Sequence, residues 1–148
     1  MTRQANRSTK KNVTAWVWII GIAVIALAVF AAYSALAVPT GEKALAREIT
    51  VSQAAELRNQ GAFILDVREP DEWAAGHIPG ATLIPLGELA SRLSELPQDQ
   101  QIVVVCRSGN RSATGRDILL DAGFQQVTSM GGGMNSWISQ GLPSVTGP

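Results

Sequence analysis

The chain has 148 residues, enough for one ordinary domain and an extension, and its 12 basic side chains balance its 12 acidic ones. A single cysteine, Cys106, excludes an intramolecular disulfide and a cysteine-rich metal site, and a single histidine, His77, argues against a zinc cluster. Residues 1–12 hold four of the basic side chains, so the remainder is acidic, which argues against a nucleic-acid partner. We expect neither a metal nor a cofactor.

The N-terminal segment has the pattern of a membrane anchor. Residues 13–38 contain no charged side chain, and the apolar run Ala15–Ala32 approaches the length that a transmembrane helix needs. Because basic residues precede this run, we expect residues 1–12 in the cytoplasm and a single-pass protein of the cell membrane whose domain is extracytoplasmic. The alternative is a signal peptide cleaved near Ala37, which would leave a secreted or periplasmic domain. Residues 39–48 are expected to be a linker.

Residues 49–143 alternate short apolar runs with helical segments, and residues 144–148 are expected to be a tail. Such alternation predicts an α/β fold with a central parallel sheet of about five strands and helices on both faces. The expected strands are Ile49–Val51, Ala62–Leu65, Ala81–Ile84, Ile102–Val105 and Gln126–Met130. Five helices are expected: one capped by Ser52, one at Glu69–Trp73, one at Leu86–Leu96, one from an N-cap at Ser112 to Gly123, and one around Trp137.

The strand at Ile102–Val105 delivers Cys106 into a short polar loop ahead of a helix, at the sheet edge where α/β folds bind ligands. A helix N-terminus and the two guanidinium groups of Arg107 and Arg111 should lower the pKa of this thiol below about 8.5. Gly109 can adopt a positive φ, which lets the loop turn its amides inward around an anion. We therefore predict a reactive thiolate in an accessible loop, and not an inert core cysteine.

The run from Cys106 to Ser112 resembles the active-site loop of single-domain rhodaneses, of the thiosulfate sulfurtransferase type. The resemblance extends from Ile49 to about Pro143 and takes in Leu65–Glu69, Gly76–Ala81 and Gly131–Trp137 in the family's order. It implies a rhodanese-like fold, preceded here by one transmembrane helix. It also implies that sulfane sulfur passes from thiosulfate or a related donor to cyanide or a thiol through a persulfide on Cys106.

Under this resemblance Cys106 is the catalytic residue, and Asp66 and Arg68 support the site as a structural ion pair. We expect Arg111 to bind the sulfonate end of thiosulfate and Arg107 to steer anions. The full set of expected substrate-binding residues is Arg107, Ser108, Gly109, Asn110, Arg111 and Ser112.

Two alternatives stay open. The first is a cysteine phosphatase or arsenate reductase, a class whose active-site loop has five residues between its cysteine and its arginine. Here only four residues separate Cys106 from Arg111. This shorter spacing predicts a loop that is too tight for phosphate. A binding module or sulfur carrier could also use the rhodanese scaffold, although degenerate members typically lack the cysteine. We expect His77 to be a hydrogen-bonded strut and Gly131–Gly133 to let the backbone pass beside the Cys106 loop, while Trp73 packs near the site.

Overall fold

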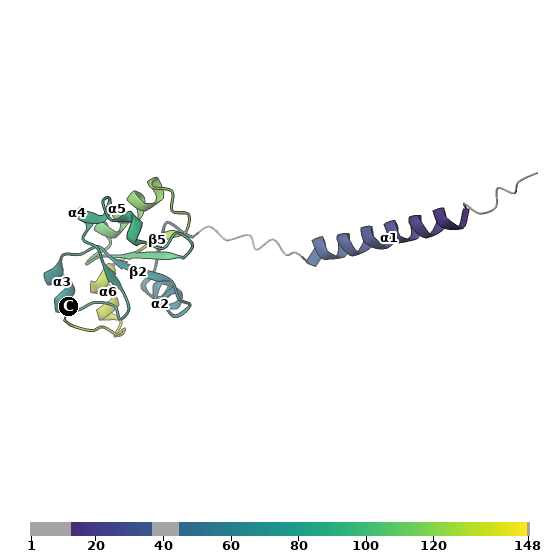
Figure 1. The fold of residues 1–148 in the computed structure, drawn as a ribbon. Coiled ribbons are helices and arrows are strands. Elements are labelled where there is room, and N and C mark those ends of the chain that lie inside the picture. Colours follow the sequence, from purple (N-terminus) through teal and green to yellow (C-terminus); the bar gives the residue numbers. More distant parts are fainter. Residues whose placement is uncertain (1–12, 37–44, 148) are drawn as a thin grey trace, which may run out of the picture. The chain divides into compact units, whose positions relative to one another are not determined.

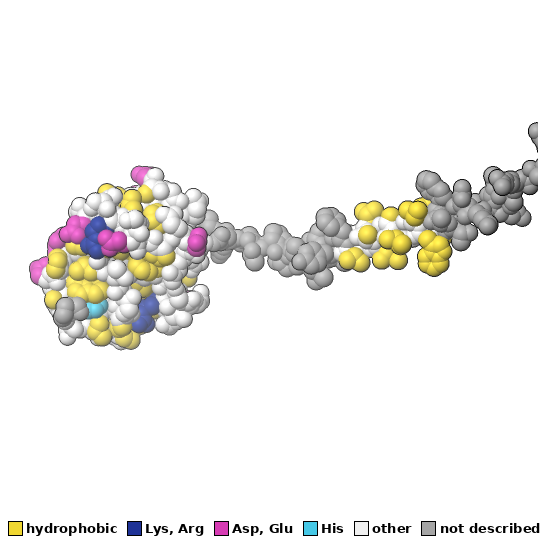
Figure 2. All heavy atoms as spheres, viewed as in Figure 1, with side chains coloured by type: hydrophobic (Ala, Val, Ile, Leu, Met, Phe, Trp, Pro, Cys, Tyr) yellow, Lys and Arg dark blue, Asp and Glu magenta, His cyan; other side chains and the backbone are white. Residues whose placement is uncertain are grey.

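The computed structural model describes residues 13–36 and 45–147, which belong to two separate units, Met1–Glu42 and Lys43–Pro148. In the first unit, helix α1 spans Val13–Leu36 (Figure 1). Its described side chains, those of residues 17–29, are exposed (Figure 2).

Within the described residues, no helix combines the length and the apolar character that crossing a membrane requires. The structure therefore gives no support to the anchor expected at residues 13–38. Part of that segment, like the expected cleavage site near Ala37, lies outside the described residues, as do residues 1–12.

A parallel sheet forms the centre of the second unit (Figure 1). It has five strands, in the order β1-β5-β4-β2-β3. The middle strand, β4, is buried along its whole length, as its run of apolar residues predicts. The five strands are β1 (Glu48–Ile49), β2 (Phe63–Asp66), β3 (Thr82–Leu83), β4 (Ile102–Val105) and β5 (Val127–Met130).

Helices cover both faces of the sheet, because successive residues of each strand point to opposite sides. Val104 packs with Leu119 on one face, whereas Val103 and Val105 pack with Trp137 on the other. The predicted α/β architecture is therefore confirmed for this unit. Its helices are α2 (Val51–Asn59), α3 (Pro70–Ala75), α4 (Leu86–Leu89), α5 (Asn110–Asp121) and α6 (Gly133–Ser139), with a 3₁₀ turn, η1, at Leu93–Glu95.

Several predicted helices begin or end elsewhere, and two of them show why. Thr50, and not Ser52, caps α2, because its side chain accepts from the Gln53 amide while the Gln53 side chain accepts from the Thr50 amide. The single helix expected at Leu86–Leu96 is wrong: the chain forms α4 and η1 instead. Leu96 is extended because it precedes a proline, and the two short pieces suffice to bury the leucines on one side.

The C-terminal residues, predicted as a tail, fold back onto the domain. The Val145 and His77 backbones exchange two hydrogen bonds, of 2.8 and 2.9 Å, and the Gly147 amide donates to the carbonyl of Ala74 at 3.0 Å. The indole of Trp137 donates to the carbonyl of Pro143 at 2.9 Å. These bonds hold the turn after α3, which borders the site described next.

Candidate functional site

The loop after β4 places Cys106 at the carboxyl edge of the sheet. In the register of β2 and β4, Asp66 lies beside Val105, so the two strands end together. The loop beginning at Cys106 turns directly into α5, whose N-cap is Gly109 with φ 108°. Only a residue without Cβ adopts this left-handed conformation readily, which explains the glycine.

The sulfur of Cys106 takes the place of a side-chain cap for α5. The Gly109 amide donates to Cys106 Sγ at 3.1 Å, and Ser112 Oγ lies 3.7 Å from the same sulfur. The expectation that Ser112 is the N-cap was therefore wrong. Ser112 is the third residue of the first turn, and its hydroxyl donates to the Gly109 carbonyl at 2.7 Å. The first amides of a helix have no internal partners, and here some of them face the thiol.

This arrangement lowers the pKa of Cys106 below its ordinary value. Burial of the thiol opposes the shift, since it raises the pKa, but the amides of Ser112, Gly109 and Ser108 and the Ser112 hydroxyl outweigh it. The direction agrees with the sequence-based expectation, and so does the part of its cause that lay in the amides of the loop and the helix N-terminus. Peptide dipoles and a hydroxyl, and not the guanidinium groups, are the principal causes.

The thiol itself is covered. Cys106 is only 1% exposed, whereas Arg107, Ser108 and Asn110 are exposed. The expectation of an accessible loop is correct for these neighbours and wrong for the sulfur. A reactant must therefore approach through the surface beside the loop.

Helix α6 fixes the orientation of the loop peptides. The Met134 amide donates to the carbonyl of Cys106 at 2.8 Å, and the Asn135 amide donates to the carbonyl of Arg107 at 3.0 Å. A Cβ on Gly133 would lie 2.3 Å from the Cys106 carbonyl oxygen, so only glycine permits this approach. The glycine run thus lets the backbone pass beside the Cys106 loop, as predicted. Because α6 holds the Arg107 carbonyl, the Ser108 amide of the same peptide group is left to face the sulfur.

Asp66 and Arg68 form a buried ion pair that joins the end of β2 to α3. The Arg68 guanidinium donates to both carboxylate oxygens of Asp66, at 2.6 to 2.9 Å, and to the carbonyls of Glu72 and Gly76. Both residues are at most 4% exposed. Every charged atom therefore has a partner, as a buried pair requires, and the pair fixes α3 beside the loop.

Arg111 does not face open solvent as a free cation. Its guanidinium donates to Glu72 in a bidentate pair, with distances of 2.7 Å (Nη1 to Oε2) and 2.8 Å (Nη2 to Oε1). Hydrogen bonding to Arg111 lowers the pKa of Glu72, and the same bonds raise the pKa of Arg111, so both stay ionised. By contrast, Arg107 makes no ion pair with any residue in the described part of the chain.

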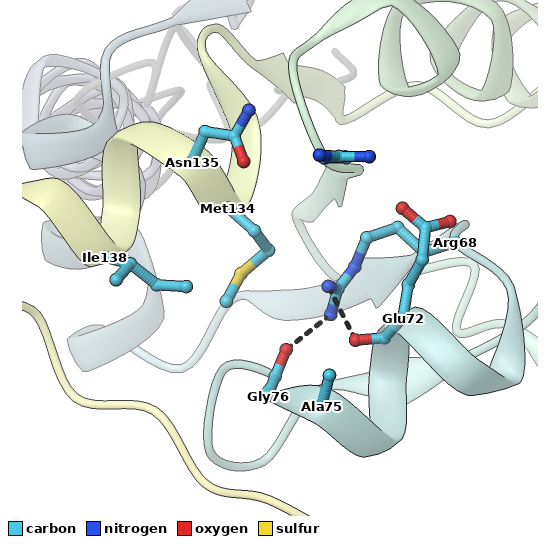
Figure 3. A pocket seen from close by; sticks show the side chains of 8 residues that line it. Arg68, Glu72, Ala75, Gly76, Met134, Asn135 and Ile138 are labelled. Carbon is cyan, nitrogen blue, oxygen red and sulfur yellow. Dashed lines mark hydrogen bonds between the residues drawn. The ribbon is translucent and has the colours of Figure 1, made fainter.

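A cavity of about 240 Å³ opens beside the loop, between α3 and α6 (Figure 3). Its lining combines charged groups with apolar ones: Arg68, Glu72, Ala75, Gly76, Arg107, Met134, Asn135 and Ile138. Sequence reasoning missed Glu72. The sequence does place an acidic residue on the short helix after β2. That this residue pairs with Arg111, in the helix after β4, depends on β2 and β4 being neighbours in the sheet.

His77 and Trp73 form a stacked pair between α3 and the turn that follows it. Their rings stack with centroids 3.5 Å apart and an angle of 7° between planes. His77 Nδ1 lies 3.1 Å from the Trp73 carbonyl oxygen. This geometry agrees with the expected role of His77 as a hydrogen-bonded strut. It also shows that Trp73 packs against the His77 ring.

A lone cysteine beside amide groups at a helix N-terminus, on a parallel α/β sheet, is an arrangement that suits nucleophilic chemistry at sulfur. The chain belongs to the rhodanese family: the rhodanese-like domain matches residues 50–140. A sulfurtransferase of Allochromatium vinosum is 37% identical over 86 residues, which make up 58% of this chain and 80% of that protein. The thiosulfate sulfurtransferase GlpE of Pseudomonas entomophila is 38% identical over 93 residues, 63% of this chain and 85% of that protein.

The fold is also similar to solved structures. A crystal structure of a rhodanese-related protein from Thermoplasma volcanium matches with a TM-score of 0.63 and 35% identity, over 68% of this chain and 98% of that one. Together these relatives support sulfur transfer as the general activity.

Replacing Gly133 by alanine tests the contact between α6 and the loop. The new Cβ would meet the Cys106 carbonyl and would also sit on a backbone with φ 54°, so we expect G133A to lower the free energy of unfolding by about 2–5 kcal/mol. Gly141 is the matched control, because it also has a positive φ (70°) but open space around its Cβ. G141A should cost only the backbone strain, about 1–2 kcal/mol. Equal losses in denaturant titrations of the two variants would contradict the proposed contact.

Proposed function

We propose that this protein is a sulfurtransferase that takes sulfane sulfur from thiosulfate or a related donor and passes it to a thiophilic acceptor through a persulfide on Cys106. The observation that carries the proposal is the set of amides and the hydroxyl around Cys106 Sγ, which lower the pKa of the thiol. A thiolate is the form of cysteine that attacks sulfur. The sulfurtransferases among the relatives support the same reaction class.

The first half of the reaction is attack by the Cys106 thiolate on the outer sulfur of thiosulfate. A new S–S bond forms, the S–S bond of thiosulfate breaks, and sulfite leaves with the bonding electron pair. The protein then carries an anionic persulfide. The amides of Ser108, Gly109 and Ser112 and the Ser112 hydroxyl, which stabilise the thiolate, are placed to stabilise negative charge on the added sulfur too.

In the second half, cyanide or a thiolate attacks the outer sulfur of the persulfide. The Cys106–sulfur bond breaks, and the Cys106 thiolate is restored as the leaving group. Neither half removes a proton from the reactants, so the chemistry needs no general base, in keeping with a His77 ring stacked on Trp73. Because Cys106 is the only cysteine, the sulfur must leave to an outside acceptor.

The remaining loop residues are assigned by their positions. Arg107 is exposed at the cavity and is the guanidinium free to meet an incoming anion, as proposed from the sequence. Arg111 can bind a sulfonate only by leaving or sharing Glu72. Asn110 starts α5 and is exposed beside the loop. The buried Asp66–Arg68 pair positions this edge without touching the reacting atoms.

The persulfide is tested by incubating the full chain with thiosulfate and measuring its intact mass. We expect a gain of one sulfur atom, its removal by cyanide with formation of thiocyanate, and no gain in the Cys106→Ser variant. Gain without turnover would favour the sulfur-carrier alternative. No gain from thiosulfate or from an organic persulfide would overturn the proposal, and comparable turnover of a phosphotyrosine mimic would favour a phosphatase.

We also propose, from the sequence alone, that residues 13–38 anchor the protein in the cell membrane with the domain on the extracytoplasmic side. The proposal rests on the uncharged segment and on the four basic side chains within residues 1–12. After expression in bacterial cells, the full-length chain should stay in the membrane fraction in alkaline carbonate, and protease added to spheroplasts should digest the domain. A shortened soluble chain beginning after Ala37 would favour the signal peptide, and a full-length chain in the cytosol would exclude both.

A further inference from the structure

Glu72 is held in place before any reactant arrives. It belongs to the first turn of α3, and its Oε2 accepts from the Glu69 amide at 3.2 Å in a capping box. The same oxygen accepts from Arg111 Nη1 at 2.7 Å. The backbone carbonyl of Glu72 accepts from Arg68 Nη1 at 3.0 Å. The carboxylate is therefore a fixed part of the site.

This carboxylate also faces the cavity that leads to the loop. Glu72 and Arg107 both line the cavity. Of the three guanidinium groups at this edge, Arg68 is paired with Asp66 and Arg111 with Glu72, so only Arg107 is left without an ion pair in the described part of the chain. An approaching anion thus meets one free cation and one fixed carboxylate. A dianion such as thiosulfate gains less from this arrangement than it would from two free arginines.

The rest of the cavity wall is mostly apolar, and Asn135 is its polar member. Met134 is largely buried, so Ile138 and Ala75 provide most of the wall's exposed apolar surface. Figure 3 shows Met134 and Ile138 on one side of the cavity and Ala75 on the opposite side. The Ile138 side chain is 55% exposed, which leaves its surface available to a reactant. An organic group attached to sulfur would find contacts here that the small, fully charged thiosulfate ion cannot use.

We infer that Glu72 is a specificity-determining residue, whose carboxylate occupies Arg111 and opposes multiply charged anions, so that the site favours organic persulfides and thiols over thiosulfate. The inference rests on the proposed function and refines its substrate class. Glu72 thus influences which reactants reach Cys106, and it takes no part in breaking or forming bonds.

The test uses Glu72→Gln, which removes the charge and keeps an oxygen that can accept from Arg111. Asp71→Asn is the matched control, because Asp71 is the preceding residue of α3, is exposed and makes no ion pair with the described residues. We expect E72Q to lower the KM for thiosulfate by about three- to tenfold, and D71N by less than about twofold, as general charge effects at exposed sites are small. The difference should shrink at high salt.

A second measurement keeps the inference separate from the proposed reaction. Cys106 is alkylated with iodoacetate, an anion, and with iodoacetamide, its neutral counterpart, and the ratio of the two rates is compared among the full-length variants. E72Q should raise the iodoacetate-to-iodoacetamide ratio by about three- to tenfold over the wild type, and D71N by less than about twofold.

These outcomes separate the two claims. Equal ratios in E72Q and D71N would overturn the role of Glu72, whatever the protein does with thiosulfate. An E72Q chain whose unfolding midpoint is unchanged, but whose KM for thiosulfate rises, would also overturn it, since Glu72 would then help to bind the donor. Failure of the wild type to form a persulfide would count against the proposed function alone, because the alkylation ratio does not depend on sulfur transfer.

Discussion

The site depends on one constraint: the peptides of the Cys106 loop must point their amides toward the sulfur. Helix α6 supplies part of this constraint, since its first-turn amides bind the carbonyls of Cys106 and Arg107, and the Arg107 carbonyl shares a peptide group with the Ser108 amide that faces the sulfur. Peptide groups have fixed dipoles, so holding a carbonyl on one side leaves the amide of the same unit on the other. The closeness of the two backbones is the reason that Gly133 has no side chain.

The sheet brings the other parts of the site to the same edge. Because β2 and β4 are parallel neighbours in register, the residues after both strands meet, and the buried Asp66–Arg68 pair joins this edge to α3. The short helix then carries Glu72 to Arg111, 39 residues further along the chain. Cys106 thus directly follows a strand that is buried along its whole length, and the residues that line the cavity lie on the helices and loops around it.

The sequence predicted the parts of this arrangement that depend on local patterns. Apolar runs located the strands approximately, and the polar run after Val105 located the loop, because buried parallel strands and glycine-containing turns leave clear patterns. The first strand was displaced: β1 is Glu48–Ile49 and not Ile49–Val51, because Thr50 caps α2 and Val51 begins it. The single helix predicted at Leu86–Leu96 was wrong because the leucine spacing indicates only which side of the segment packs against the core. Two short helical pieces, α4 and η1, place the leucines on that side equally well. The cap at Ser112 was wrong because Gly109, in a left-handed conformation, is the N-cap and α5 begins at Asn110, while the sulfur of Cys106 accepts from the Gly109 amide. The pairing of Glu72 with Arg111 follows only from the order of the strands.

The central claim is that the loop keeps Cys106 ionised. The most direct test is a pH titration of the thiolate ultraviolet absorbance of the full chain, with the Cys106→Ser variant subtracted to remove other titrating groups. We predict a midpoint below the ordinary pKa of a cysteine thiol, about 8.5. Because the pKa of Cys106 is lower in the folded than in the unfolded chain, the thiolate stabilises the fold fully when the pH is above the ordinary pKa. This stabilisation is lost as the pH falls through the lowered pKa of the folded chain. A midpoint at or above the ordinary value would contradict the account, because burial would then outweigh the amides.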